Sequence, residues 1–270
     1  MKELRAQRGR RYIASLVAEG EHEHQDFKFT ISDAHKIAHS VSAFANAGGG
    51  RLLIGVKDNG VMAGIRNEED IYVVEQAARR LCDPPVEVEF TAYRVDEHAI
   101  VIKATIPQAT VRPVRCREAD GRWRAYCRVA DENIVAHPLM VRAWQADAPV
   151  SFSLDSTAAE LLQWLDTQPE GVESTEIALR LGLSQRRADN LIVSLASAGI
   201  LTFIYRAPRF LIARMHEERC SVRTDEKDKH ASPQRGVGDP SATAGTLIHL
   251  VSDPRAAGMV ALSTGAPVRS

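Results

Sequence analysis

A short segment in the last third of the chain carries four side chains of the types that bond base edges in nucleic acids: Gln185, Arg186, Arg187 and Asn190. Arginine pairs with guanine, and asparagine or glutamine pairs with adenine. Apolar residues continue at helical spacing, so the four side chains fall on the first turns of a helix, the part that a recognition helix presents to the major groove. Arg206 and Arg209 further along the chain are available to hold phosphates. The pattern predicts a nucleic-acid contact.

The elements around these residues predict the fold that would present them. A helix opens with a capping box at Thr157, two helices follow around a turn at Gly182, and a strand hairpin comes last. This order is that of a winged helix-turn-helix, which we place at residues 153–214. The alternative is the same fold used for dimerisation or domain docking, with its arginines solvated. The predicted bounds are 175–181 and 185–198 for the two helices, and 201–204 and 210–213 for the strands.

A triple glycine, Gly48, Gly49 and Gly50, separates a predicted helix from a predicted strand. Glycines this dense either bend the chain or let a ligand approach the backbone, and their amides can form a nest that contacts phosphate. The chain has no GxxxxGK[ST] motif, and the glycines precede a strand instead of opening a helix, so a P-loop is not predicted. Nucleotide (ATP) binding without a P-loop is the weaker alternative.

The surroundings of the triple glycine predict an α+β sandwich over residues 1–145. A helix over 33–47, capped by Ser32 or Asp33, precedes the glycines, and a strand over 52–56 follows them. The turn residues Asp58-Asn59-Gly60 predict a hairpin whose second arm is 61–65. Neighbouring hairpins and helices favour α+β over a doubly wound sheet. The other predicted elements are helices over 2–17 and 68–81 and strands over 24–30, 86–95, 99–106 and 124–129.

One pair of histidines has the spacing of metal ligands. His35 and His39 lie one turn apart on the polar face of the predicted helix, and Ser42 and Asn46 continue that stripe. Two histidines at this spacing form a zinc site only when a third ligand joins them, and the sequence identifies none.

Composition bounds the class of protein. The chain has 270 residues, 44% of them hydrophobic, and a formal net charge of -1, so any nucleic-acid site must be a local basic patch. Four cysteines without a CxxC pair argue against a zinc knuckle or a disulfide framework and favour a reducing cytosol. No apolar run approaches the roughly 20 residues that span a bilayer, so we expect a cytoplasmic protein without membrane contact. Residues 217–270 are poor in apolar residues and are expected to form a flexible tail.

Several motifs between residues 15 and 135 resemble the Schlafen/AlbA-like family of DNA-binding domains. They are Glu21-x4-Asp26-Phe27-Lys28, Val41-Ser-Ala-Phe-Ala-Asn-x-Gly-Gly, Leu53-Ile-Gly-Val-x-Asp-x-Gly, Arg112-Pro113-Val114 and Tyr126-x-Arg128-Val129. The resemblance implies a nucleic-acid-binding module, which in bacterial regulators is often joined to a winged helix. We therefore expect a regulator that binds DNA or structured RNA, requires no cofactor for binding, and is compatible with a homodimer.

In some eukaryotic members of that family, a carboxylate cluster cleaves structured RNA. Carried over to this chain, the cluster falls on Glu21, Asp26 and Asp58, which would hold Mg²⁺ or Mn²⁺ and activate water, while Lys28 would steady the phosphate charge. Asp26 is one methylene shorter than the family's usual glutamate, a change that active sites rarely tolerate. The same residues are also ordinary at an exposed strand start and in a turn. The resemblance thus implies a metal-dependent nuclease as the alternative function.

Overall fold

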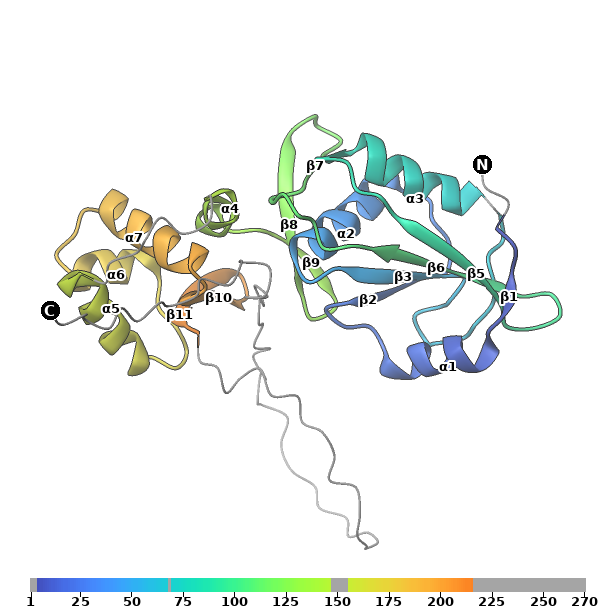
Figure 1. Ribbon diagram of the computed structural model, residues 1–270, viewed down its shortest axis with the longest axis horizontal. Helices are drawn as coiled ribbons and strands as arrows, with labels where there is room; N and C mark the ends of the chain where they lie inside the picture. Colours follow the sequence, from blue (N-terminus) through green and yellow to red (C-terminus); the bar gives the residue numbers. More distant parts are fainter. Residues whose placement is uncertain (1–3, 68, 147–154, 216–270) are drawn as a thin grey trace, which may run out of the picture.

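A mixed sheet of five strands forms the centre of the N-terminal half of the chain (Figure 1). The structure is a computed structural model that describes residues 4–67, 69–146 and 155–215. The strand order is β1 (Gln7–Arg8), β5 (Glu89–Arg94), β6 (Ile100–Ile106), β3 (Gly50–Ile54) and β2 (Gln25–Lys28). The β1–β5 and β2–β3 pairs are parallel, and the two inner pairs are antiparallel. This order places β2 at one edge of the sheet.

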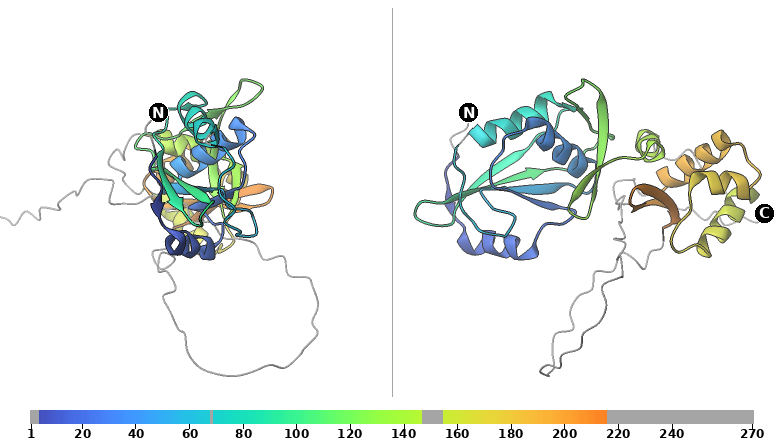
Figure 2. Two further views of the ribbon diagram at one scale, coloured as in Figure 1. Left: turned by 90° about the vertical axis from the view of Figure 1, so that its right-hand side faces the viewer. Right: turned by 180° about the vertical axis from the view of Figure 1, so that it is seen from behind.

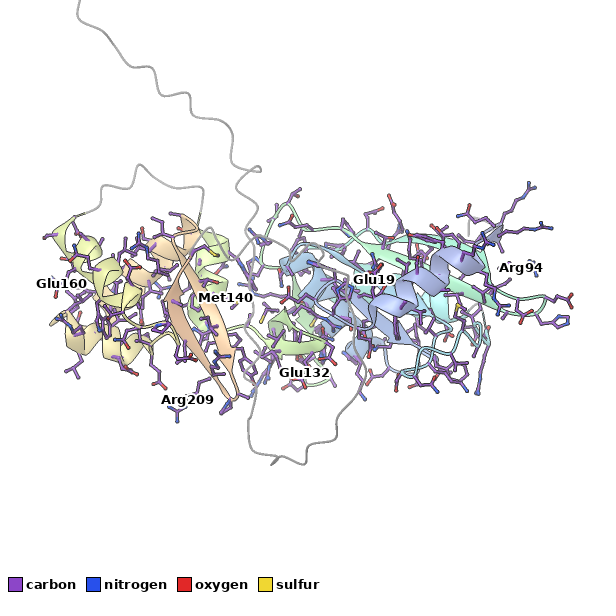
Figure 3. The ribbon with its side chains drawn as sticks, turned by 90° about the horizontal axis from the view of Figure 1, so that it is seen from below. Glu19, Arg94, Glu132, Met140, Glu160 and Arg209 are labelled. Atoms are coloured by element: carbon purple, nitrogen blue, oxygen red, sulfur yellow. The ribbon has the colours of Figure 1, made fainter. Side chains whose placement is uncertain are left out.

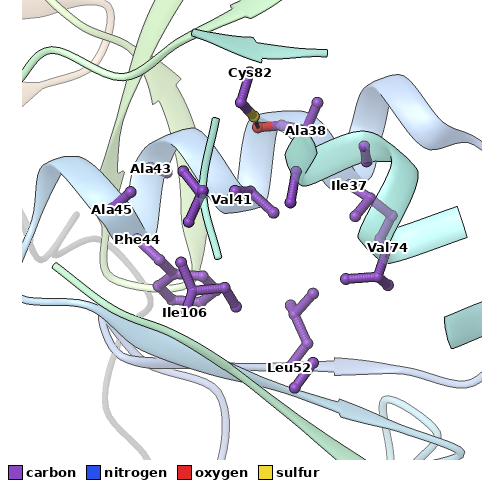
Figure 4. Packing of buried hydrophobic residues seen from close by; sticks show 14 of the residues in the cluster. Ile37, Ala38, Val41, Ala43, Phe44, Ala45, Leu52, Val74, Cys82 and Ile106 are labelled. Atoms are coloured by element: carbon purple, nitrogen blue, oxygen red, sulfur yellow. Dashed lines mark hydrogen bonds between the residues drawn. The ribbon is translucent and has the colours of Figure 1, made fainter. Parts of the chain in front are cut away.

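Helices cover both faces of this sheet (Figure 2). Helix α1 (Arg10–Glu19) lies on one face, and α2 (Ala34–Asn46) and α3 (Glu69–Arg80) lie on the other. Alternate residues of a strand point to opposite faces, so Leu53 packs with α1 whereas Leu52 and Ile54 pack with α2. Figure 4 shows the core on the α2 side, where Phe44 faces Ile106.

A second, antiparallel sheet packs against another side of α2. Its strands stand in the order β4 (Cys82–Asp83), β7 (Arg115–Arg117), β8 (Trp123–Val129) and β9 (Glu132–Val135). Ser42 Oγ donates to the carbonyl of Val114 at 2.8 Å, and Asn46 Nδ2 donates to the carbonyl of Tyr126 at 3.0 Å. Every α2 residue from Ile37 to Asn46 except His39 is buried. The polar stripe of this helix therefore faces a sheet and not solvent.

Two elements of the N-terminal half differ from the sequence prediction. Residues 61–65 are not a hairpin arm, because β2 and β6 already occupy both edges of β3, and Val56 and Met62 form only an isolated bridge. The helix predicted over 2–17 begins at Arg10, after Gly9 and the short strand β1. A Cβ at Gly9 would lie 2.2 Å from a ring carbon of Tyr93, so close packing requires this glycine.

The other predicted elements of this half are confirmed to within a few residues at their ends. Asp33 caps α2 as expected, since its Oδ1 accepts from the backbone N–H groups of His35 and Lys36. Three short strands, β4, β7 and β9, and helix α4 (Pro138–Gln145) were not predicted.

The C-terminal elements follow the predicted order of helices and hairpin. They are α5 (Ser156–Asp166), α6 (Ser174–Arg180), α7 (Gln185–Ser197), β10 (Leu201–Arg206) and β11 (Arg209–Arg214). Strands β10 and β11 pair antiparallel, and Val172 adds a bridge to Ile212. The cap of α5 is Asp155, whose Oδ1 accepts from the backbone N–H of Ala158 at 2.8 Å, and not Thr157 as predicted.

One apolar cluster joins β8 to the C-terminal elements. It contains Cys127 of β8, Met140 of α4, Leu161 of α5 and Ile192 of α7. Figure 3 shows Met140 between the two halves of the molecule. The cluster thus includes residues on both sides of the division predicted at 145–153. The predicted tail, 217–270, lies outside the described residues. None of the helices in the described ranges has the length and hydropathy of a membrane span.

Candidate functional site

Glu21, Asp26 and Lys28 lie together at the edge strand β2. Glu21 precedes the strand, and its Oε1 accepts from the backbone N–H of Phe27 at 2.8 Å. Asp26 is 4% exposed, and its Oδ1 accepts from Lys28 Nζ at 2.8 Å. Arg128, a 2% exposed residue of β8, brings Nη2 to 3.9 Å from the same oxygen. Sequence reasoning placed the first three residues together but gave no charge role to Arg128.

The surroundings of Glu21 change its affinity for a proton. The pKa of Glu21 is raised from 4.5 to about 6, chiefly by burial and then by a side-chain hydrogen bond with Asp26. Burial also raises the pKa of Glu23. Glu21 thus holds its proton to a higher pH than an ordinary glutamate does.

Asp58 does not join this pair. Asp58 is exposed in the turn after β3. Asp26 pairs with Leu52 of β3, and Leu52 precedes Asp58 by six residues. Within the described residues, Glu21, Asp26 and Asp58 do not form a group of three whose side-chain oxygens all lie within 4.8 Å of one another. The expected turn forms, since the Gly60 N–H donates to the carbonyl of Lys57, but it does not bring the third carboxylate to the strand.

The triple glycine both bends the chain and permits close packing. Gly49 has φ +82°, and a Cβ there would lie 3.0 Å from the carbonyl oxygen of Ile106. A Cβ at Gly50 would lie 2.2 Å from a ring carbon of Phe44. The N–H of Gly49 donates to the Phe44 carbonyl at 3.0 Å, so this amide already ends α2. Phosphate contact by Gly48, Gly49 and Gly50 stays a prediction.

The predicted base-contacting residues occupy the first turns of α7. Arg186 and Arg187 are exposed there. Gln185 donates to the carboxylate one turn along the same helix, at 2.7 Å. Asn190 accepts from Arg142 Nη2 of α4 at 2.7 Å, so its side chain already has a partner within the chain. Arg186 and Arg187 are the members of the set that face solvent without a side-chain hydrogen-bond or ion-pair partner among the described residues.

The predicted phosphate-contacting arginines of the hairpin are paired with acidic residues. Arg206 Nη2 lies 3.0 Å from Glu170 Oε2, and Arg209 Nη1 lies 2.6 Å from Glu173 Oε1. The Arg209 side chain is 71% exposed, whereas that of Arg206 is 25% exposed. Exposed ion pairs contribute at most about 1 kcal/mol, so the pair of Arg209 is easily broken.

A basic hairpin between β7 and β8 was missed by sequence reasoning. It carries four arginines and one tryptophan: Arg115, Arg117, Arg122, Trp123 and Arg124. The last four are exposed, and Trp123 is 46% exposed. The hairpin extends past the end of α2 (Figure 1). Its signal was present as two Arg-x-Arg pairs around the Asp120-Gly121 turn, within a chain whose net charge gave no hint of a basic patch.

One comparison with known proteins finds a family model that matches most of the N-terminal half. Residues 21–137 match the family model described as Schlafen, AlbA_2, which supports a Schlafen/AlbA-like domain in this part of the chain. The comparison with curated proteins finds no match. Among solved structures, the chain is similar to the DIP2311 protein from Corynebacterium diphtheriae, with 20% sequence identity and a TM-score of 0.36. The match covers 70% of this chain and 34% of that one, so the chain spans about a third of the length of that protein.

Proposed function

We propose that this protein binds nucleic acid through the hairpin of β7 and β8. The observation that carries the proposal is the hairpin itself, on which Arg117, Arg122, Trp123 and Arg124 are exposed together. Arg122 is 3.6 Å from Asp120, while Arg117 and Arg124 have no ion-pair partner among the described residues. Guanidinium groups bind phosphates, and an exposed indole offers a face on which a base can stack. The match to the Schlafen/AlbA-like family is compatible with this function.

We assign a second contact to the C-terminal elements. Helices α5 to α7 and the β10–β11 hairpin follow the order of a winged helix-turn-helix, and the first turn of α7 presents Arg186 and Arg187. Two contact surfaces in residues 1–145 and 153–214 suit a bacterial-type regulator that binds DNA. This assignment rests on element order and exposure, and a docking role for the same helices is the alternative.

Salt-dependent binding of labelled DNA and RNA tests both contacts. Substitution of Arg117, Arg122 and Arg124 by Gln should weaken binding and flatten the slope of log affinity against log salt, by about 0.9 for each phosphate that the variant no longer neutralises. The matched control replaces three exposed arginines of α1 and α3, namely Arg10, Arg11 and Arg80, and changes the net charge equally. Equal losses of affinity in both triple variants would show a general charge effect and overturn the hairpin assignment.

The C-terminal contact is measured in the same assay. Arg186→Ala combined with Arg187→Ala should weaken binding to DNA and lower the salt slope. Unchanged affinity would leave this module a docking or dimerisation element.

A metal-dependent nuclease is the second candidate, favoured by the adjacency of Glu21 and Asp26. Any cation there has to compete with Lys28 and Arg128 for Asp26. Incubation of labelled RNA and DNA with Mn²⁺ tests this candidate. It predicts cleavage by the wild type and loss of cleavage in Glu21→Gln and in Asp26→Asn. No cleavage by the wild type, or equal cleavage by the variants, contradicts it.

A further inference from the structure

Three side chains of different chemistry meet where α2 approaches the end of β7. His39 of α2, Cys116 of β7 and Glu118 just after β7 each bring one potential ligand atom within 4.8 Å of the other two. Cys116 is fully buried, and the side chains of His39 and Glu118 are 23% and 17% exposed. The group is therefore screened from solvent but open on one side.

The neighbours of this group hold its members in place. His39 Nε2 lies 3.1 Å from Glu118 Oε2, and the hydroxyl of Tyr126 donates to the other oxygen, Oε1, at 2.8 Å. The rings of His39 and Tyr126 stack with centroids 4.2 Å apart. Cys116 is fixed through its place in the sheet, opposite Cys82 of β4. Such outer contacts are the kind that orient metal ligands.

We propose that His39, Cys116 and Glu118 bind a zinc ion, with a water molecule as the fourth ligand. Imidazole nitrogen, thiolate sulfur and carboxylate oxygen are the three ligand types that Zn²⁺ takes, whereas Mg²⁺ and Ca²⁺ bind through oxygen alone. His35, one turn earlier on α2, is not a fourth member, because its Nδ1 lies 2.8 Å from the carbonyl oxygen of Arg117.

Charge balance supports a divalent cation at this position. A neutral imidazole, a thiolate and a carboxylate together carry the charge that Zn²⁺ cancels, so the occupied site is neutral overall. In the absence of a cation, burial raises the pKa of the Cys116 thiol and keeps it protonated. On binding, the Cys116 thiol would release its proton to water, the cation would take the place of the hydrogen bond between His39 and Glu118, and it would tie α2 directly to the basic hairpin. The proposal does not depend on that hairpin binding nucleic acid.

Metal analysis and cobalt substitution of the full-length protein test the site. Elemental analysis after purification without chelators should find one zinc per chain. Replacement by Co²⁺ should give a cobalt–thiolate charge-transfer band and the strong visible bands of a tetrahedral site. Cys116→Ser should lose the thiolate band, whereas Cys127→Ala, which removes a buried thiol that faces the other side of β8, should keep it. An unchanged band in Cys116→Ser, or no stoichiometric zinc and no band in the wild type, overturns the proposal.

A second variant keeps the test valid if the buried cysteine is needed for folding. His39→Asn changes a partly exposed side chain, and it should weaken zinc affinity at least tenfold. Added zinc should raise the melting temperature of the wild type and of His35→Asn but not that of His39→Asn. If zinc raises the melting temperatures of all three proteins equally, the three residues form a hydrogen-bonded structural contact and not a zinc site.

Discussion

Asn46 and Val114 form a reciprocal pair of hydrogen bonds across the contact between α2 and the second sheet. Asn46 Nδ2 donates to the Val114 carbonyl at 2.9 Å, and Asn46 Oδ1 accepts from the Val114 N–H at 2.7 Å. Both residues are fully buried. The Asn46 side chain thus satisfies both the N–H and the C=O of Val114, as a neighbouring β-strand would.

Asn46→Ala should lower the free energy of unfolding by about 2–4 kcal/mol, because the Val114 N–H loses its acceptor while it stays buried. Urea denaturation followed by tryptophan fluorescence measures the change. Asn59→Ala is the matched control, since Asn59 is exposed and accepts only from the Val61 N–H at 3.2 Å. It should cost less than about 1 kcal/mol. Equal costs for the two substitutions would contradict the assigned role of Asn46.

Arg128→Leu should destabilise the protein by about 3–5 kcal/mol, because it leaves the buried carboxylate of Asp26 with one cation fewer. Arg128 also donates to the carbonyl of Gln25 at 3.3 Å and lies over the ring of Phe44. Lys28→Met is the comparison, since the Lys28 side chain is 32% exposed and Arg128 would stay beside Asp26. It should cost about 1 kcal/mol. A larger cost for Lys28→Met than for Arg128→Leu would assign the main counter-charge to Lys28.

Glu21→Gln should make the stability of the protein less dependent on pH. The folded pKa of about 6 lies above the value of 4.5 for the free group, so the folded state binds more protons than the unfolded state between these values. The contribution of Glu21 to the free energy of unfolding should fall as pH rises from 4.5 to 6, and Glu21→Gln should lack this contribution. Denaturant titrations of both proteins from pH 4 to 8 give the difference. A difference that is constant across this range would show that Glu21 does not titrate as described.

Gly50→Ala should destabilise the protein by about 1–3 kcal/mol, because the new methyl group overlaps the buried ring of Phe44. A Cβ at Gly48 would instead lie 3.0 Å from the ring of the exposed His24 side chain, which can move. Gly48→Ala should therefore cost less than about 0.5 kcal/mol. Combining Gly50→Ala with Phe44→Leu should cost less than the sum of the single changes. Strict additivity in thermal melts would mean that the two residues do not meet.

Local signals predicted the elements whose stability is mainly local. The cap at Asp33 and the glycine stop after Asn46 each act within a few residues of the helix they define. The short strands β4, β7 and β9 have no such signal. β7 exists because Cys116 pairs with Cys82 and Arg115 pairs with Ala125, and these partners are fixed only by the tertiary fold.

In the candidate sites, too, the sequence predicted local neighbours but not contacts between distant segments. The sequence placed Glu21, Asp26 and Lys28 on one short segment, and they do lie together. It could not show that Arg128 approaches Asp26 from another sheet, or that Asp58 stays apart in its turn. The sequence also did not identify further metal ligands for the predicted histidine pair, for a similar reason. Cys116 and Glu118 lie far along the chain from His39, and only the packing of β7 against α2 brings them to it.

Because α2 lies between two sheets, its contacts can form only in a fixed order while the chain is being synthesised. Its apolar side can pack on β3 soon after synthesis. Ser42 cannot form its hydrogen bonds until Val114 and Tyr126, which follow it by 72 and 84 residues, have been made. At 5–20 residues per second, that interval is roughly 4 to 17 s. During this time the polar side chains of α2 form their hydrogen bonds with water. The side of α2 that will contact the second sheet stays exposed to solvent. Translation speed across residues 50–126 therefore decides how long the centre of this fold is exposed to other molecules.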